Sequence, residues 1–260
     1  MAPVTLTVVL DPTLDSDPDS RVDINFTHPV AKDRFDSAQT FLEALIDGRR
    51  LPPMMGIQNL NVSAIVSAVL FLHRPLAISG EAARLAYGAD LVVRKGVLGA
   101  SMLPQGLGEY LLSLEQSSMS PMLSVGAKRE LLTRGATQLR AYLEGILSLE
   151  GFQMDPEIYT YSLNETTAFL SASTLQSGWL YGLRAGTLQA IVATPTSVGV
   201  FRRSLEVPWR IKVLCAQLNQ TGTGVWEPKT PLSVHLKEGT TFPLGVESGF
   251  QIFQILTDHR

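Results

Sequence analysis

This chain of 260 residues is 45% hydrophobic and only 17% charged, which gives it enough apolar material for a large buried core and excludes a disordered tail protein. Its 21 Lys and Arg residues against 24 Asp and Glu residues leave a formal net charge of -3, without the basic excess that is usual in proteins that bind nucleic acid by counterion release. The single cysteine, Cys215, excludes an intramolecular disulfide and a thiolate metal cluster within one chain.

The N-terminal residues predict two strands joined by an acidic loop. Val4–Leu10 is rich in β-branched residues, and Arg21–Phe26 places apolar side chains at alternate positions, so both segments favour strands. Between them, Asp11–Ser20 concentrates Asp, Ser and Pro, a composition that is typical of a loop. We therefore expect a β-hairpin with a long acidic tip.

Neither a signal peptide nor a membrane span is expected. Met1–Leu10 has no basic leader and no apolar run of signal-peptide length. The most apolar segment, Val62–Leu72, has about half of the roughly 20 residues that a membrane-spanning helix needs, and Pro75 soon follows it. We expect this segment to be a buried core helix, and the protein to be cytoplasmic or part of an intracellular or viral assembly.

From about Asp33 to about Glu150 the hydrophobic period is close to three and a half residues, which predicts about five amphipathic helices. For the first helix, Asp33 is the expected N-cap, Asp36 lies three residues on as in a capping box, and Gly48 ends it. The fifth helix is the longest, and its apolar spacing extends over around 25 residues. The expected starts of the second to fifth helices are, in order, Asn61, Ser79, Leu107 and Ser124.

Beyond Gly151 the pattern changes to short strand-like segments broken by Gly or Pro, which predicts a mainly antiparallel sheet. The last segment is expected to be a terminal strand buried on both faces. The segments are Tyr159–Tyr161, Ala190–Val192, Val198–Phe201, Ile211–Leu214, Leu232–Lys237 and Phe250–Leu256.

The order of a strand pair, then helices, then strands predicts an α+β protein rather than an alternating α/β sheet. A soft boundary at Gly151–Asp155 divides the chain into residues 1–150, with the strand pair and the helical segment, and residues 151–260, which are rich in β structure. The alternative is a single domain in which the N-terminal strands join the C-terminal sheet and the helices form an insertion.

The densest group of carboxylates lies in the N-terminal acidic segment. Its alternating Asp residues resemble the start of a calcium loop, but Ser20 and Phe26 stand where an EF-hand needs Gly and Glu. The interpretation is a solvated loop. The carboxylates are Asp11, Asp15, Asp17, Asp19 and Asp23.

A second group could support metal chemistry. His28, Asp33 and Asp36 lie between an expected strand and the helix that follows it, and a histidine with two carboxylates can hold a divalent ion that activates water. The metal ligands of this hypothesis are His28, Asp33 and Asp36, although the segment supplies few ligands and the two Asp residues already have a capping role.

A third hypothesis concerns nucleic acid. Arg202, Arg203 and Arg210 lie among tryptophans of the β-rich part, and such mixtures form stacking platforms for single strands. Strands also use aromatic residues simply to pack, and the local charge is mild.

No nucleophile elbow, phosphate-binding loop or kinase-type motif occurs, so the sequence favours a protein that is not an enzyme and needs no cofactor. A long amphipathic helix and several β-edges that a neighbour can complete favour a non-catalytic structural or assembly protein. Such a protein acts through contacts with protein partners and self-associates into a homo-oligomer, with no membrane contact. The alternatives are a divalent-metal-dependent hydrolase and a nucleic-acid-associated subunit of a larger complex.

Overall fold

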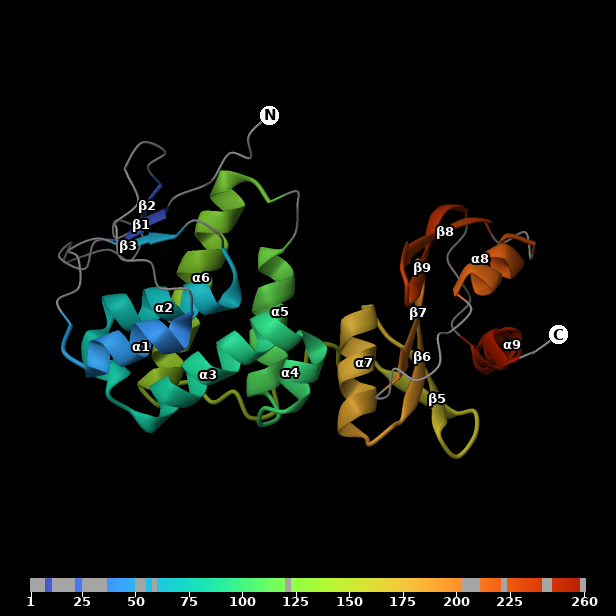
Figure 1. Cartoon of the computed structure of the whole chain (residues 1–260), viewed down its shortest axis with the longest axis horizontal. Helices are drawn as coiled ribbons and strands as arrows, with labels where there is room; N and C mark the ends of the chain where they lie inside the picture. The colour runs from blue at the N-terminus through green and yellow to red at the C-terminus, as the bar shows by residue number, and fades with distance from the viewer. Residues whose placement is uncertain are drawn as a thin grey trace. The chain divides into compact units, whose positions relative to one another are not determined.

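The chain forms two compact units, Met1–Phe152 (unit 1) and Gln153–Arg260 (unit 2), which are drawn in Figure 1. The computed structural model describes residues 8–10, 22–24, 37–49, 55–57, 60–119, 123–202, 211–220, 224–239 and 245–257.

Helices dominate unit 1, and α2 lies at its centre. Nine of the eleven residues of α2 are buried, and this helix contacts α1, α3, α5 and α6. The expectation of a buried core helix at Val62–Leu72 is therefore confirmed. The helices are α1 (Ala38–Ile46), α2 (Val62–Leu72), α3 (Gly80–Lys95), α4 (Val97–Ser101), α5 (Leu107–Ser118) and α6 (Val125–Leu143), with a 3-10 turn η1 (Arg74–Ala77) after α2.

The expected starts of α2, α3 and α6 are confirmed, and the side chains of Asn61, Ser79 and Ser124 cap these helices, because each accepts a hydrogen bond from the backbone N–H three residues on. The expected cap of α1 is wrong. Its N-cap is Ser37, which forms a reciprocal capping box with Thr40, so α1 begins later than Asp33. Helix α6 has 19 residues, fewer than the apolar spacing suggested.

A small three-stranded sheet also belongs to unit 1. Its order is β2-β1-β3, and both pairings are antiparallel. The predicted N-terminal strand pair is confirmed, and β3 pairs with the other edge of β1. The strands are β1 (Val8–Leu10), β2 (Val22–Ile24) and β3 (Met55–Ile57).

Unit 2 is built on a six-stranded mixed sheet of order β4-β5-β6-β7-β9-β8. Only the β5–β6 pairing is parallel, and helix α7 provides the crossover between these two strands. The strands are β4 (Tyr159–Ser162), β5 (Thr167–Ser171), β6 (Gln189–Thr194), β7 (Ser197–Arg202), β8 (Gly224–Thr230) and β9 (Ser233–Gly239), and the helices are α7 (Leu175–Arg184), α8 (Ile211–Gln220) and α9 (Val246–Thr257).

Helices cover both faces of this sheet (Figure 1). Ile191 belongs to the core that α8 and α9 share with the sheet, whereas the next residue of β6, Val192, lies against α7 at Gly178. Successive strand residues point to opposite faces, so α7 lies on one side and α8 with α9 on the other. This explains why every residue of β5 is buried.

Two expected strands of unit 2 are helices. The segment Ile211–Leu214 begins α8, whose buried residues Ile211, Leu214, Cys215 and Leu218 recur at helical spacing. The segment Phe250–Leu256 lies in α9, where Ile252 and Leu256 are buried but Phe250 is 43% exposed, so only one face is covered. The predicted class is nevertheless confirmed: the fold is α+β, with helices mostly in the middle of the chain and strands mostly towards its C-terminus. No helix in the described parts is long and apolar enough to span a membrane.

Candidate functional site

Most of the residues singled out from the sequence lie outside the described ranges. His28, Asp33 and Asp36 do so, as do Arg203 and Arg210, so the metal-site and nucleic-acid hypotheses stay predictions. Among the residues that the structure does describe, no group of three or more His, Cys, Asp or Glu side chains is arranged to hold a metal ion.

Of the predicted nucleic-acid contacts, Arg202 is described. It ends β7 opposite Gln189 of β6 and is partly buried. Burial lowers the pKa of the Arg202 guanidinium from its ordinary value.

The buried carboxylates of unit 1 hold helix N-termini. Asp90 on α3 is 4% exposed and accepts hydrogen bonds from the first two N–H groups of α1, Ala38 and Gln39, both at 3.0 Å. It also accepts from the hydroxyl of Ser63 on α2, at 2.7 Å. A carboxylate at this position satisfies unpaired N–H groups and favours the positive end of the helix dipole.

Two buried glutamates on α5 have the same role. Glu115 accepts a hydrogen bond of 2.8 Å from the N–H of Val62 at the start of α2, and Glu109 accepts one of 2.6 Å from the N–H of Gly106 at the start of α5 itself. Each of these acids accepts a hydrogen bond from a helix N-terminus, so their burial has a structural explanation.

In unit 2, Asp155 binds the segment that leads into α7. It accepts hydrogen bonds from the N–H of Ser173 at 2.5 Å, the hydroxyl of Ser177 at 3.2 Å and the N–H of Glu157 at 3.2 Å. Burial by itself raises the pKa of Asp155, but the hydrogen bonds from Ser173, Glu157 and Ser177 outweigh it and hold the pKa below its ordinary value. The ionised carboxylate therefore fixes the first residues of unit 2 to α7.

A serine and a histidine meet across two strands of the sheet. Ser197 Oγ of β7 lies 3.0 Å from His235 Nδ1 of β9, and Glu227 of β8 stands opposite His235 on its other side. Directly opposite residues of antiparallel strands share a face, so the three form a row. The row contains the residue types of a nucleophile, a base and an orienting acid.

The surroundings of this row do not complete a hydrolytic site. Glu227 pairs with Lys237 Nζ at 3.0 Å, and Ser197 is paired in the sheet with both Thr194 and His235, so its backbone belongs to the ladder rather than to an oxyanion hole. A cavity of about 150 Å³ lies between α5 and α6 of unit 1, away from this row, and it is smaller than typical small-molecule sites. We interpret the serine–histidine contact as a cross-strand hydrogen bond.

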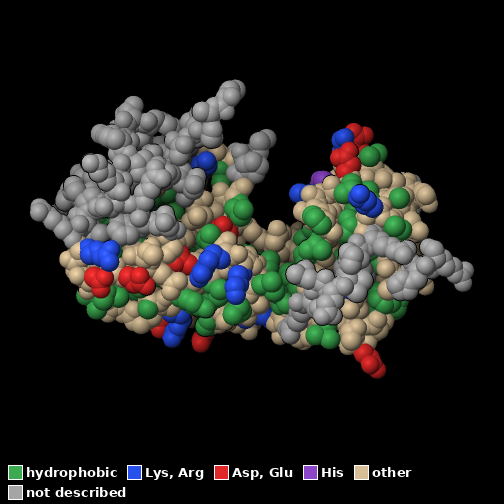
Figure 2. All heavy atoms as spheres, in the orientation of Figure 1, with side chains coloured by type: hydrophobic (Ala, Val, Ile, Leu, Met, Phe, Trp, Pro, Cys, Tyr) green, Lys and Arg blue, Asp and Glu red, His purple; other side chains and the backbone are tan. Residues whose placement is uncertain are grey.

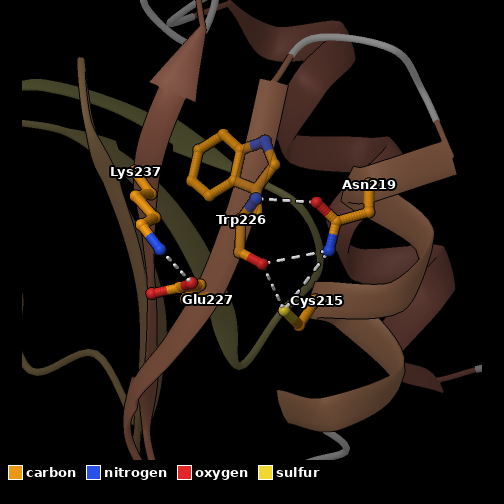
Figure 3. Close-up of polar contacts among 5 residues, drawn as sticks. All are labelled: Cys215, Asn219, Trp226, Glu227 and Lys237. Carbon is orange, nitrogen blue, oxygen red and sulfur yellow. Dashed lines mark hydrogen bonds and ion pairs between the residues drawn. The ribbon is translucent and has the colours of Figure 1, made fainter.

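The two edges of the six-stranded sheet differ. At the β8 edge, the side-chain amide of Asn219 on α8 brackets the peptide groups of Trp226: it accepts from the Trp226 N–H at 2.7 Å and donates to the Trp226 C=O at 3.0 Å (Figure 3). Cys215 Sγ donates to the same carbonyl at 3.1 Å. Asn219 thus occupies the place of a neighbouring strand.

The thiol at this edge is not activated. Cys215 is 7% exposed, and burial, with a smaller contribution from the Glu227 carboxylate, raises the pKa of the Cys215 thiol. A reactive cysteine needs a lowered pKa and an accessible position. Cys215 is therefore a packing residue and part of the edge closure.

Further devices keep other strands away from β8. Its pairing with β9 is irregular at Val225/Trp226 and at Pro228/Thr230, and Pro228 supplies no N–H. Charged side chains gather over the β8–β9 hairpin (Figure 2). Glu227 of β8 and Lys237 of β9 form an exposed ion pair. Proline, irregular pairing and charge are the usual means by which a sheet edge is protected.

The β4 edge has none of these devices. Its four residues, Tyr159 to Ser162, carry no charge and no proline, and Tyr159 is 62% exposed. The N–H of Leu163 donates to the C=O of Thr167, which fixes the alternation of the β4–β5 ladder. Tyr159 and Tyr161 therefore bond to β5, whereas Thr160 and Ser162 turn their N–H and C=O groups outwards.

These outward groups are free within the part of the chain that is described: no hydrogen bond there uses the backbone N–H or C=O of Thr160 or Ser162. Both residues are exposed. The strand itself is anchored, because Tyr161 is partly buried and stacks on Phe169 of β5 with ring centroids 6.2 Å apart. The open β4 edge, defined by Tyr159–Ser162, is the candidate functional site.

Sequence reasoning found the strand at Tyr159–Tyr161 but not its place at the edge, because strand order depends on long-range pairing. It also missed the contact of Ser197 with His235, which are 38 residues apart. The uncharged composition of β4 was the one local signal. Comparisons with known proteins found no family model that matches the chain, and no significantly similar curated protein or solved structure.

Proposed function

We propose that this protein is a non-catalytic assembly protein that acts through protein–protein contacts and self-associates, and that the open β4 edge is the contact. One observation carries the proposal: the same sheet has one edge closed by a side-chain clamp, a proline and charges, and another edge that is uncharged and has no pairing strand among the described residues. An unprotected edge strand is a template for pairing with another chain.

The contact should be weak. A strand of four residues buries much less than the roughly 1,200 Å² of a standard stable interface. We expect concentration-dependent association with a dissociation constant of roughly 10 µM to 1 mM, unless further surfaces add to it.

Substitution of Thr160 by proline tests the proposal. The Thr160 N–H points away from β5, so Thr160→Pro removes an outward donor and leaves the β4–β5 ladder in place. The lost hydrogen bond is worth about 1 kcal/mol, and the proline ring also obstructs an incoming strand, so the dissociation constant should rise by roughly tenfold or more. Size-exclusion chromatography with light scattering over a wide concentration range measures this.

Thr160→Val is the matched control, because it keeps the N–H and the β-branched shape. It should associate like the wild type, and both variants should keep the wild-type melting temperature within a few degrees. Wild-type protein that is strictly monomeric at millimolar concentration, or a folded Thr160→Pro variant that associates as well as Thr160→Val, would contradict the proposal.

A further inference from the structure

We infer that the partner of the open β4 edge is β4 of a second copy of this chain, which pairs with it antiparallel about a two-fold axis beside Tyr161. This inference rests on the proposed function and specifies its partner and register. The pairing would join the two six-stranded sheets into one continuous sheet.

The hydrogen-bonding pattern of β4 selects this register. Within the strand, the outward groups are those of Thr160 and Ser162, one N–H and one C=O on each. An antiparallel pair exchanges both bonds between residues that stand directly opposite each other. The two-fold register that uses both residues places Thr160 opposite Ser162 of the second copy, with Tyr161 opposite itself.

The strand can pair with a second copy of itself, because it is uncharged and its outward hydrogen-bonding groups are self-complementary. It carries no charged side chain, so two copies meet without repulsion inside the ladder, and its outward donors and acceptors are equal in number. A two-fold interface requires such self-complementarity. The axis also brings the two Tyr161 side chains together at a non-hydrogen-bonded position, where facing side chains lie closest and aromatic pairs are favourable.

The flanking charges give this register a characteristic salt dependence. Glu157 and Glu165 are exposed and flank β4 on its two sides, and the two-fold axis brings Glu157 of one copy towards Glu165 of the other. Salt screens the repulsion between these exposed glutamates. Association should therefore strengthen, not weaken, as the ionic strength rises.

Disulfide trapping tests the register. The tested proteins are the Tyr161→Cys, Thr160→Cys and Ser162→Cys variants, alone and as an equimolar mixture of the last two, with a size tag on one of them. The wild-type chain is the control, since its only cysteine is the buried Cys215. Mild oxidation is followed by non-reducing electrophoresis, and melting curves identify the variants that fold.

The Tyr161→Cys variant should form a homodimer, because directly opposite residues lie within disulfide reach. The mixture should form the tagged heterodimer at least fivefold faster than either variant alone forms a homodimer, since two copies of position 160 lie about 8 Å apart in this register. The mixture keeps the test valid if Tyr161→Cys fails to fold.

Two results would overturn the inference. If Thr160→Cys or Ser162→Cys alone forms a homodimer as fast as the mixture forms a heterodimer, the register is wrong. If no folded variant is trapped although Thr160→Pro still abolishes association, the partner surface is not a second β4, while the proposed function stands. If association survives Thr160→Pro, the proposed function fails as well.

Discussion

Asp90 links three helices, because its carboxylate on α3 binds the start of α1 and the hydroxyl of Ser63 on α2. Asp90→Ala leaves buried donors without this acceptor, and each such donor costs about 1–3 kcal/mol. We expect a loss of roughly 2–4 kcal/mol in the free energy of unfolding of unit 1, measured by urea denaturation.

Asp47→Ala is the matched control for this substitution. Asp47 is an exposed carboxylate at the other end of α1, where it pairs only loosely with Arg49 at 3.6 Å. Its removal should change stability by no more than about 0.5 kcal/mol. Equal effects of the two substitutions would show that Asp90 has no special role.

We expect Asp155 to make a pH-dependent contribution to the stability of unit 2. Because the folded-state pKa of Asp155 lies below its ordinary value, the fold favours the ionised carboxylate, and the stabilisation is present above the unfolded-state pKa of about 3.9. It is lost as the pH falls through the lower folded-state pKa. The melting temperature of Asp155→Asn should therefore be lower than that of the wild type near pH 7, and the difference should shrink below about pH 4. A difference that persists unchanged in acid would contradict this account.

At the scale of single residues, contacts between neighbours in the sequence were predictable, and contacts between residues far apart in the sequence were not. Asn61, Ser79 and Ser124 bond to the N–H three residues on, so a short stretch of sequence contains both partners. Asp90 bonds to Ala38 from 52 positions away, and nothing in the sequence near Asp90 indicates that partner. The same distance effect hid the bond between Ser197 and His235.

Among the elements, α7 packs closely against the sheet at Gly178, where there is no room for a Cβ atom. A Cβ atom at Gly178 would lie 2.4 Å from a methyl group of the fully buried Val192, too close for an undistorted contact. Gly178→Ala should destabilise unit 2 by about 1–3 kcal/mol. Val192→Ala in the same chain should recover part of that loss, and a double-mutant cycle measures the coupling.

Gly80→Ala provides the control, since a Cβ atom there has no neighbour within 4 Å and the residue begins α3. It should be neutral or slightly stabilising. Strict additivity of Gly178→Ala and Val192→Ala would mean that the close approach of α7 to β6 is not what the glycine provides.

At the β8 edge, Asn219 links α8 to the outer strand. Asn219→Ala removes both bonds to the Trp226 peptide groups and with them one of the devices that protect this edge. We expect a loss of roughly 1–3 kcal/mol and a greater tendency to aggregate on heating, measured by light scattering during a thermal ramp. Asn219→Asp keeps the acceptor but not the donor, so its stability should lie between those of the wild type and Asn219→Ala. If Asn219→Ala behaves like the wild type, the hydrogen bonds of Asn219 are dispensable.

The elements that the sequence predicted correctly are those in which the spacing of apolar residues repeats over several turns. Helices α2, α3 and α6 show three or more turns of apolar spacing, whereas Ile211–Leu214 is a window of four residues in which helix and strand look alike. The buried strand β5 and the helix α7 that follows it were missed for the same reason, because neither is long enough to show a clear period.

At the scale of the whole molecule, composition predicted a large core, and the order of periods predicted the α+β class. Strand order could not be predicted from the sequence. The parallel β5–β6 crossover and the β8–β9 hairpin place β4 at one edge and β8 at the other, and both are set by pairing between segments. The contrast between these two edges is the basis of the proposed self-association.

Amide hydrogen exchange measured at increasing protein concentration tests that self-association most directly. The N–H groups of Thr160 and Ser162 should exchange quickly in dilute solution and slow progressively as the concentration rises, because pairing at β4 protects them. The Trp226 N–H, already bonded to Asn219, should exchange slowly throughout. The account is contradicted if the protein associates while the exchange of Thr160 and Ser162 stays independent of concentration.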